Sequence, residues 1–254
     1  MNDQLSLPRL GWMLRSDLLR TYRAVLVISG TAALVALAVS IGIAYFGEVG
    51  RSELFYRIFF VAALFAWGAM ATSSCFSDMH GRGTNMAFLL LPASALEKTV
   101  SRLLIYTVGL VVYLLAFTTV LSWVVEGINT LWIGERREFF SPLDPVAWLL
   151  LPHFIVTQAL FFLGAAWFRK LQVVKTVGTT IGIVLGLACT FVAIAWLFGG
   201  LWSDTTIRFD GDGQFAPLKW LIDVAPFAYY YALPLFCWFV AWLRVTESQV
   251  SHAI

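Results

Sequence analysis

Charged residues are scarce in this chain of 254 residues. Asp, Glu, Lys and Arg make up 13% of it, apolar and aromatic residues make up 60%, and the mean hydropathy is +0.81. An ordinary soluble domain carries about 25% charged and about 45–50% apolar residues. A soluble protein of the present composition would expose large apolar patches. The composition therefore excludes a soluble enzyme, a disordered tail and a disulfide-stapled secreted module, and it predicts an integral membrane protein.

Several chemical signatures are absent as well. The sequence has no G-x-x-x-x-G-K-[ST] phosphate-binding loop, no G-x-S-x-G, no H-E-x-x-H and no Asp-rich motif at the end of an apolar run. Its three cysteines, Cys75, Cys189 and Cys237, lie in apolar stretches and are expected to be small buried side chains rather than a disulfide framework. The net charge of +2 indicates no nucleic-acid partner. We therefore expect that the chain by itself is not an enzyme and binds no cofactor or metal directly.

Long apolar runs dominate what is present. A helix needs roughly 20 apolar residues to cross a hydrocarbon core of about 30 Å, whereas a barrel strand needs only about 9–11 residues of alternating polarity. The runs are continuous, so they predict six transmembrane helices and a single six-helix domain over residues 1–254. The predicted spans are Ala24–Phe46, Phe55–Cys75, Leu103–Val125, Trp148–Trp167, Val177–Phe198 and Phe227–Leu243.

The distribution of basic residues predicts the orientation. With both termini in the cytoplasm, the inside segments hold 11 of the 17 Lys and Arg residues, as the positive-inside rule requires. We therefore expect a multi-pass protein of a plasma (bacterial inner) membrane. The predicted inside segments are 1–23, 76–102, 168–176 and 244–254, and the longer outer loops are 126–147 and 199–226.

The segment before the first span is amphipathic. Leu10, Leu14, Leu18 and Tyr22 recur every fourth residue, with arginines on the far side. This pattern predicts that residues 1–23 form a helix lying in the cytoplasmic interface. The alternative is that the segment extends the first span as a cytosolic stem.

The loop over residues 76–102 carries the most information. Gly81 and Gly83 are expected to end the preceding helix, and Pro92 ends a short apolar helix over Met86–Leu91. The run Ser94–Glu97 is a capping box that opens a helix leading into the third span. The Met86–Leu91 helix is too short to cross a membrane. It can dock on the membrane surface, pack on the chain's own helices or enter a groove on a soluble partner, and composition does not choose among these.

Two segments resemble the ABC-2 family of ABC-transporter permeases. The first is the run Leu-Leu-Leu-Pro-Ala-Ser-Ala-Leu-Glu-Lys over Leu89–Lys98, between a second and a third span. The second, weaker one is the ending Trp242–Val250, with Glu247 shortly after the last span. The six spans, the inside termini and the amphipathic first segment are similar to that family too. The segment from Met79 to Gly83 has no counterpart that we can assign.

The resemblance implies a transport function and a partner. In that family the loop after the second span carries a coupling helix that fits a groove on a cytosolic ATPase subunit, and ATP and Mg are bound there. Two six-helix permease subunits, identical or paralogous, and two ATPase subunits make one transporter, usually an exporter. Carried over to this sequence, the resemblance implies that the ATPase contact is made by Met86, Ala87, Phe88, Leu89 and Leu90. It also implies that the geometry with which the chain re-enters the membrane is set by Pro92, Ser94 and Glu97.

A few polar residues inside the spans are candidates for a translocation path. His153 is the one ionisable residue well inside a predicted span besides Arg57, which lies one turn from a span end. Such a residue is a functional hypothesis, although a bond to Gln158 or to a backbone carbonyl would make it structural. Small polar residues likewise either line a path or mediate helix packing. The candidate path residues are Thr72, Ser73, His153, Thr179 and Thr180.

Two further interpretations stay open. Gly178, Gly182 and Gly186 form a ridge that permits close helix approach, either within the chain or to a second copy. A secondary transporter without an ATPase is the main alternative function, and an intramembrane lipid-modifying enzyme is a weaker one. Membrane lipid surrounds the chain in every case, and the aliphatic and aromatic spans weakly favour an amphiphilic or lipid-like cargo.

Overall fold

The computed structural model describes residues 6–46, 51–81, 93–134, 139–199 and 224–250. Every regular element in these ranges is helical, and six helices are long and apolar enough to cross a membrane. The prediction of an all-helical fold with six helices long enough to span is therefore confirmed for the described residues, and it is consistent with a multi-pass membrane protein. The helices are α1 (Leu7–Phe46), α2 (Arg51–Ser73), α3 (Ser77–His80), α5 (Ala95–Leu104), η1 (Ile105–Gly109), α6 (Leu110–Ile133), α7 (Pro145–Trp167), α8 (Gln172–Gly199), η2 (Ala228–Ala232) and α10 (Leu233–Val250).

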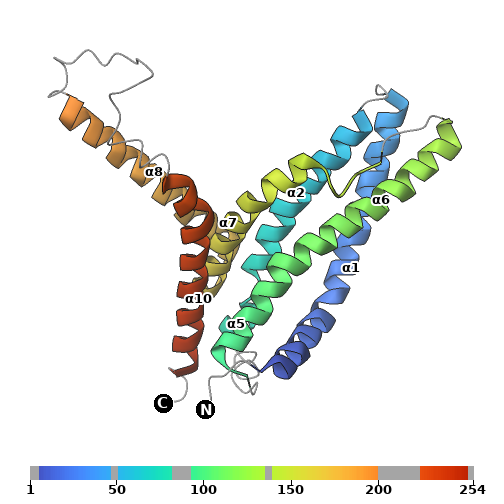
Figure 1. Cartoon of the computed structure of the whole chain (residues 1–254). Helices are drawn as coiled ribbons and strands as arrows, with labels where there is room; N and C mark the ends of the chain where they lie inside the picture. Colours follow the sequence, from blue (N-terminus) through green and yellow to red (C-terminus); the bar gives the residue numbers. More distant parts are fainter. Residues whose placement is uncertain (1–5, 47–50, 82–92, 135–138, 200–223, 251–254) are drawn as a thin grey trace.

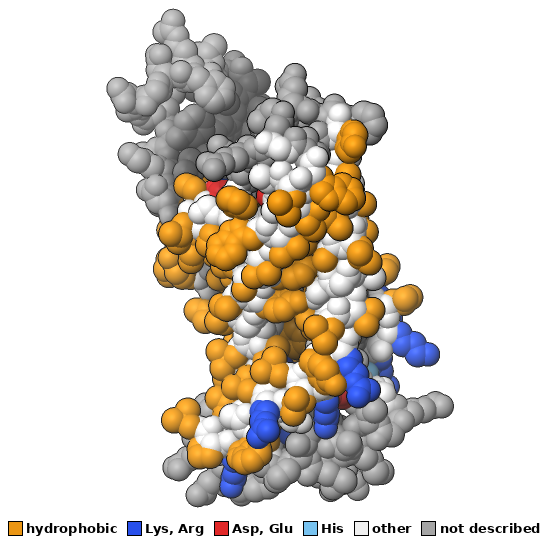
Figure 2. Space-filling view, turned by 90° about the vertical axis from the view of Figure 1, so that its right-hand side faces the viewer, with side chains coloured by type: hydrophobic (Ala, Val, Ile, Leu, Met, Phe, Trp, Pro, Cys, Tyr) orange, Lys and Arg blue, Asp and Glu red, His pale blue; other side chains and the backbone are white. Residues whose placement is uncertain are grey.

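The spans run alternately up and down a slanted bundle (Figure 1). The beginning of α1 and the end of α10 lie at the same end of it, as six crossings require. On the face drawn in Figure 2 the Lys and Arg side chains gather toward this same end, and hydrophobic side chains cover the rest of the described surface. We call it the basic end. Its assignment to the cytoplasm stays a prediction from the distribution of Lys and Arg.

The first helix is longer than a span. It runs for 40 residues without a break, which corresponds to about 60 Å, so the amphipathic segment continues directly into the first span. This is the arrangement that the stem alternative describes. The stem packs against α5. The interfacial placement of residues 1–23 stays a prediction, and residues 1–5 lie outside the described ranges.

The third span is also longer than predicted at its outer end. α5, η1 and α6 follow one another without interruption from Ala95 to Ile133, and Gly134 ends α6 in the left-handed conformation with φ 80°. The outer loop therefore begins at Gly134 rather than at residue 126. This shift places Glu126 inside the helix.

Two prolines lie within helices and are accommodated differently. Pro152 lies inside α7, which stays a single helix from Pro145 to Trp167. Pro234 lies at the start of α10, and the π-helical turn η2 comes just before it. In this turn the Leu233 N–H donates to the Ala228 carbonyl, five residues back. The wider turn makes room for a proline, which has no N–H and clashes with the carbonyl of the preceding turn.

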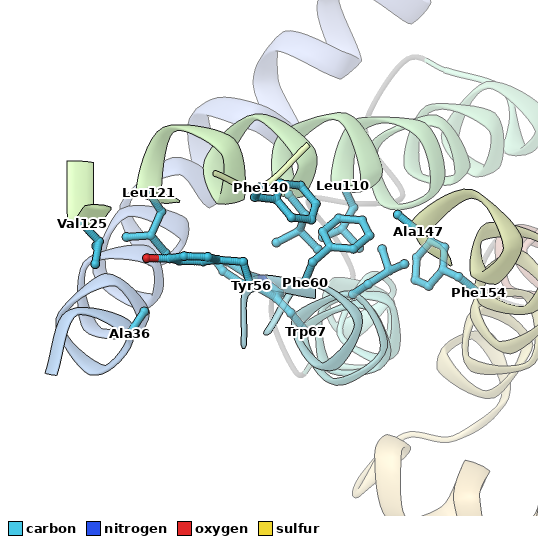
Figure 3. Packing of buried hydrophobic residues seen from close by; sticks show 12 residues of the cluster. Ala36, Tyr56, Phe60, Trp67, Leu110, Leu121, Val125, Phe140, Ala147 and Phe154 are labelled. Atoms are coloured by element: carbon cyan, nitrogen blue, oxygen red, sulfur yellow. The ribbon is translucent and has the colours of Figure 1, made fainter. Parts of the chain in front are cut away.

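The main core lies among α1, α2, α6 and α7 (Figure 3). Tyr56 and Phe60 of α2 are fully buried in it, and the Phe60 ring lies 5.5 Å from that of Phe140. Gly68 lets α2 approach α7, because a Cβ at this position would lie 2.5 Å from the Phe154 ring. A second core at the basic end joins the turn between α2 and α3 to α5, α7 and α10, around Phe76 and Phe162.

Helix α8 stands apart from these cores. It contacts α7 and α2 and leaves most of its described side chains exposed. A Cβ at Gly178, Gly182 or Gly186 would meet nothing within 4 Å. The glycine ridge is thus not used for packing among the described residues. Its contact with a second copy stays a prediction.

Candidate functional site

The predicted capping box is present at the start of α5. The Ser94 hydroxyl accepts a hydrogen bond from the Glu97 N–H at 3.1 Å, and the Glu97 carboxylate accepts one from the Ser94 N–H at 2.9 Å. The other oxygen of Glu97 accepts bonds from the N–H of Ser6 at 2.9 Å and from its hydroxyl at 3.2 Å. Glu97 is 1% exposed. One carboxylate therefore holds both the first turn of α5 and the beginning of the stem.

A network of ion pairs joins α1, α3 and α5 in the same region. Asp78 of α3 lies 3.4 Å from the guanidinium of Arg102 in α5 and 4.0 Å from that of Arg20 in α1. Arg102 is buried, and it also donates to the Cys75 carbonyl. Asp78 precedes the loop over residues 82–92 and Glu97 follows it. One flank of this loop is therefore held by an ion pair to α1, and the other by hydrogen bonds to Ser6, directly before α1.

The residues expected to contact an ATPase fall mostly outside the described ranges. Met86, Ala87, Phe88, Leu89, Leu90 and Pro92 lie between residues 82 and 92, which the structure does not describe. Helix α3 ends at His80, and Gly81 is extended, as the predicted break requires. Ser94 and Glu97, the two described members of the set, both lie at the start of α5.

Replacing Glu97 with Ala is expected to weaken the first turn of α5. The variant loses one half of the capping box and both bonds to Ser6, so we expect a loss of roughly 1 kcal/mol in local stability. Hydrogen exchange of the amides at Ser94 to Lys98 should become faster by about fivefold. Glu97→Gln keeps one acceptor oxygen and should show a smaller increase. Exchange in the alanine variant at the wild-type rate would contradict the assigned role.

The candidate path residues do not come together. Thr72 and Ser73 are buried in α2, and their hydroxyls have no hydrogen-bond partner. Thr179 is exposed and Thr180 is partly buried on α8. His153 lies on α7 and contacts the last span. A shallow apolar recess on α8, which Trp196 and Ala188 line, contains none of the five.

His153 is held by two tyrosines of the π-helical turn. Its Nδ1 lies 3.3 Å from the Tyr229 hydroxyl and its Nε2 lies 3.1 Å from the Tyr230 hydroxyl. A neutral imidazole satisfies both contacts, because one ring nitrogen donates and the other accepts. The expected partner Gln158 is not involved. Five residues along a helix correspond to a rotation of about 140°, so the two side chains point in different directions.

Gln158 instead lies within the helix packing. Its side chain is 1% exposed, and neither amide atom has a hydrogen-bond partner. The rings of Phe154 and Phe162, one turn before and after it, lie 6.1 Å from that of Phe65 in α2 and 5.0 Å from that of Phe76 in the turn after α2. Gln158 is therefore part of the packed face of α7 rather than of the group around His153.

A buried carboxylate at the opposite end was missed from the sequence. Glu126 of α6 is fully buried and accepts hydrogen bonds from the Tyr56 hydroxyl at 2.8 Å and the Ser40 hydroxyl at 3.3 Å. The Asn129 amide donates to Ser40 at 3.0 Å and to Glu126 at 3.5 Å. This cluster joins α1, α2 and α6. The available signal was an acid one position past the predicted span with Asn129 three residues on, on the same helix face.

An ion pair lies near this cluster. The Arg57 guanidinium is 2.5 Å from the Asp144 carboxylate, and Asp144 caps the N-terminus of α7 by accepting from the Val146 N–H at 2.9 Å. Arg57 lies one turn from the end of its predicted span, and its partner lies at the end of another, so the long side chain keeps its charge near the ends of the helices. The pair fixes the start of α7 against α2.

The comparison with known proteins identifies no relative of this chain. No protein-family profile, curated protein or solved structure matches the chain. Among the described residues no group of three or more His, Cys, Asp or Glu side chains is placed to hold a metal ion.

Proposed function

We propose that the chain is the membrane-spanning permease subunit of an ABC-2 type ABC transporter, an exporter driven by a separate ATPase subunit. The basis for the family is the resemblance of Leu89–Lys98 described above. The structural observation that supports the proposal is the way in which both flanks of the loop before α5 are attached to the rest of the chain. Asp78 on one flank forms an ion pair with Arg20 of α1, and Glu97 on the other flank accepts hydrogen bonds from Ser6, directly before α1. A force applied to the loop would thus reach two spanning helices at once.

The continuity of the helices supports the same mechanism. The helix that opens at Ser94 continues through η1 and α6 to Ile133, so a push at its start moves the whole third span. In the proposed cycle, closure of the ATPase subunits displaces the two coupling helices, and the spans reorient around a path between two permease copies. ATP and Mg act on the partner subunit. Coupling requires that the ATPase and the cargo each bind the two conformations with different affinity.

Co-purification with an ATPase tests the proposal. The chain is produced with the ABC ATPase encoded nearest to it, and capture is compared with that of Phe88→Asp and Leu90→Asp. A buried apolar contact that receives a carboxylate loses most of its affinity. We expect the wild type to retain the ATPase and the two variants to lose it by tenfold or more, as measured by quantitative immunoblotting.

Leu143→Asp is the matched control. Leu143 is 75% exposed, lies outside the proposed coupling loop and receives the same charge. It should leave capture unchanged. Absence of ATPase from the wild-type sample, or equal capture by all three variants, would remove the support for an ABC permease.

A secondary transporter is the second candidate, and the setting of His153 favours it. This residue joins α7 to a π-helical turn, an irregularity that is frequent at functional sites. If no ATPase associates, the deciding measurement compares uptake or efflux by the His153→Phe variant with that by the wild type.

A further inference from the structure

The connection between α7 and α8 is short and joins two helices that are long and apolar enough to cross a membrane. Helix α7 has 23 residues and is therefore about 34 Å long, close to the thickness of a hydrocarbon core of about 30 Å. It ends at Trp167, and α8 begins at Gln172. Only four residues join the two spans, so none of them reaches far beyond the membrane surface. The Phe168 N–H still bonds to the Gly164 carbonyl at 2.8 Å, which keeps the connection close to the helix end.

The connection carries positive charges that no acidic side chain of the described residues pairs with, and Lys175 lies 5.9 Å from the centre of the Phe168 ring. Arg169, Lys170 and Lys175 are exposed, and none of them forms an ion pair within the described part of the chain. The sequence contains no acidic residue between Asp144 and Asp204. We call these three residues the basic connection patch.

The charges of the elements packed nearby do not neutralise the patch. The carboxylate of Glu247 in α10 is paired with Arg244 at 2.9 Å. Asp78 of α3 faces Arg20 and Arg102 instead. Arg244 adds a further positive charge above the Trp167 ring, at 5.2 Å from its centre.

Apolar side chains are exposed on the same turn. Trp167 is 55% exposed, Leu171 71% and Val174 65%. Among the described residues Leu171 alone combines a side chain with a positive φ, 52°. In water, an exposed leucine in this strained conformation obtains no stabilisation from burial of its side chain. The side chain is buried if it enters the acyl region just below the headgroups.

We propose that this connection binds an anionic phospholipid in the leaflet at the basic end. Arg169, Lys170 and Lys175 contact the headgroup phosphate, and Leu171 and Trp167 insert beside its acyl chains. Only a surface that is both anionic and apolar satisfies the two kinds of exposed side chain together. The proposal does not depend on the transport function proposed above.

Spin-labelled lipids test the proposal with the purified full chain alone. The chain is reconstituted in phosphatidylcholine vesicles, and its association with spin-labelled phosphatidylglycerol and phosphatidylcholine is compared by electron paramagnetic resonance. A single Lys or Arg at an anionic surface contributes roughly a fivefold preference. We expect the wild type to prefer phosphatidylglycerol and the variant Arg169→Gln/Lys170→Gln/Lys175→Gln to lose that preference by about tenfold or more.

A charge-preserving variant separates the site from a folding defect. Arg169→Lys/Lys170→Arg/Lys175→Arg should keep the preference, and Leu171→Ser should reduce the association of both lipids. Glycerol phosphate at millimolar concentration should not compete, because it lacks acyl chains. Full competition by glycerol phosphate would make this a site for a soluble anion and overturn the proposal. Equal lipid preference in the wild type and the glutamine variant would overturn it too, and loss of ATPase capture in that variant would then identify the patch as a protein contact.

Discussion

Replacing Glu126 with Ala is expected to lower the free energy of unfolding by roughly 2–4 kcal/mol. The variant removes the acceptor of hydrogen bonds from Tyr56, Ser40 and Asn129 in a fully buried site. Hydrogen bonds between membrane helices contribute about 0.6–1.7 kcal/mol each, and a buried donor left without a partner adds a further penalty. Unfolding in mixed micelles with increasing SDS gives the measurement.

Two further variants test whether the lost stability comes from the buried hydrogen bonds of Glu126. Glu126→Gln keeps one acceptor oxygen and should lose about half as much stability. Glu247→Ala removes a carboxylate whose side chain is 66% exposed, and it should change the free energy of unfolding by less than about 0.5 kcal/mol. If Glu126→Ala and Glu247→Ala were equally stable, the cluster would not hold α1, α2 and α6 together.

Replacing Gly164 with Leu should separate α7 from α8 and reduce stability by roughly 3 kcal/mol. Even a Cβ at Gly164 would lie 1.9 Å from the Thr176 hydroxyl and 2.9 Å from its Cβ. Thr176 is buried, is branched at Cβ and is held by a bond to the Gln172 carbonyl at 2.7 Å, so it cannot turn away cheaply. The apparent melting temperature of the purified chain in detergent should fall.

The glycine ridge supplies the matched control. Gly182 lies on α8 with nothing within 4 Å of its Cβ position, so Gly182→Leu should leave the melting temperature unchanged or slightly raise it. The double variant Gly164→Ala/Thr176→Ala should recover most of the stability that Gly164→Ala alone loses. A large loss in Gly182→Leu would show that the ridge is packed against a second copy under the conditions of the measurement.

The larger polar clusters lie toward the two ends of the bundle, and a hydrogen bond between Ser29 of α1 and Tyr113 of α6 lies between them. Near the basic end, Glu97 of α5 accepts bonds from Ser6, directly before α1, and Asp78 of α3 forms an ion pair with Arg20 of α1. At the opposite end, Glu126 bonds α6 to α1 and α2. Between them the contacts are mostly apolar. Since lipid is as apolar as these side chains, such contacts resist sliding less than hydrogen bonds do.

Local patterns in the sequence determined the class and the span count. Continuous apolar runs fix six helices, because a backbone in hydrocarbon must satisfy its own hydrogen bonds. The capping box at Ser94–Glu97 and the break after His80 are likewise local, since a residue type and its spacing suffice to form them. The ends of the spans were predicted less accurately than their number. The third span continues to Ile133, because Glu126 and Asn129, polar by composition, are bonded to other helices.

What tertiary structure alone decided is which distant residues meet. The sequence offered Gln158 or a backbone carbonyl as the partner of His153, but the partners are Tyr229 and Tyr230, more than 70 positions away. It also offered the glycines of α8 as a ridge for packing within the chain or on a second copy, whereas the close contact with α8 among the described residues falls on Gly164 of α7. Periodicity tells which face of a helix is apolar or small. It does not tell which neighbour lies opposite that face, because this depends on how all six helices share a limited space.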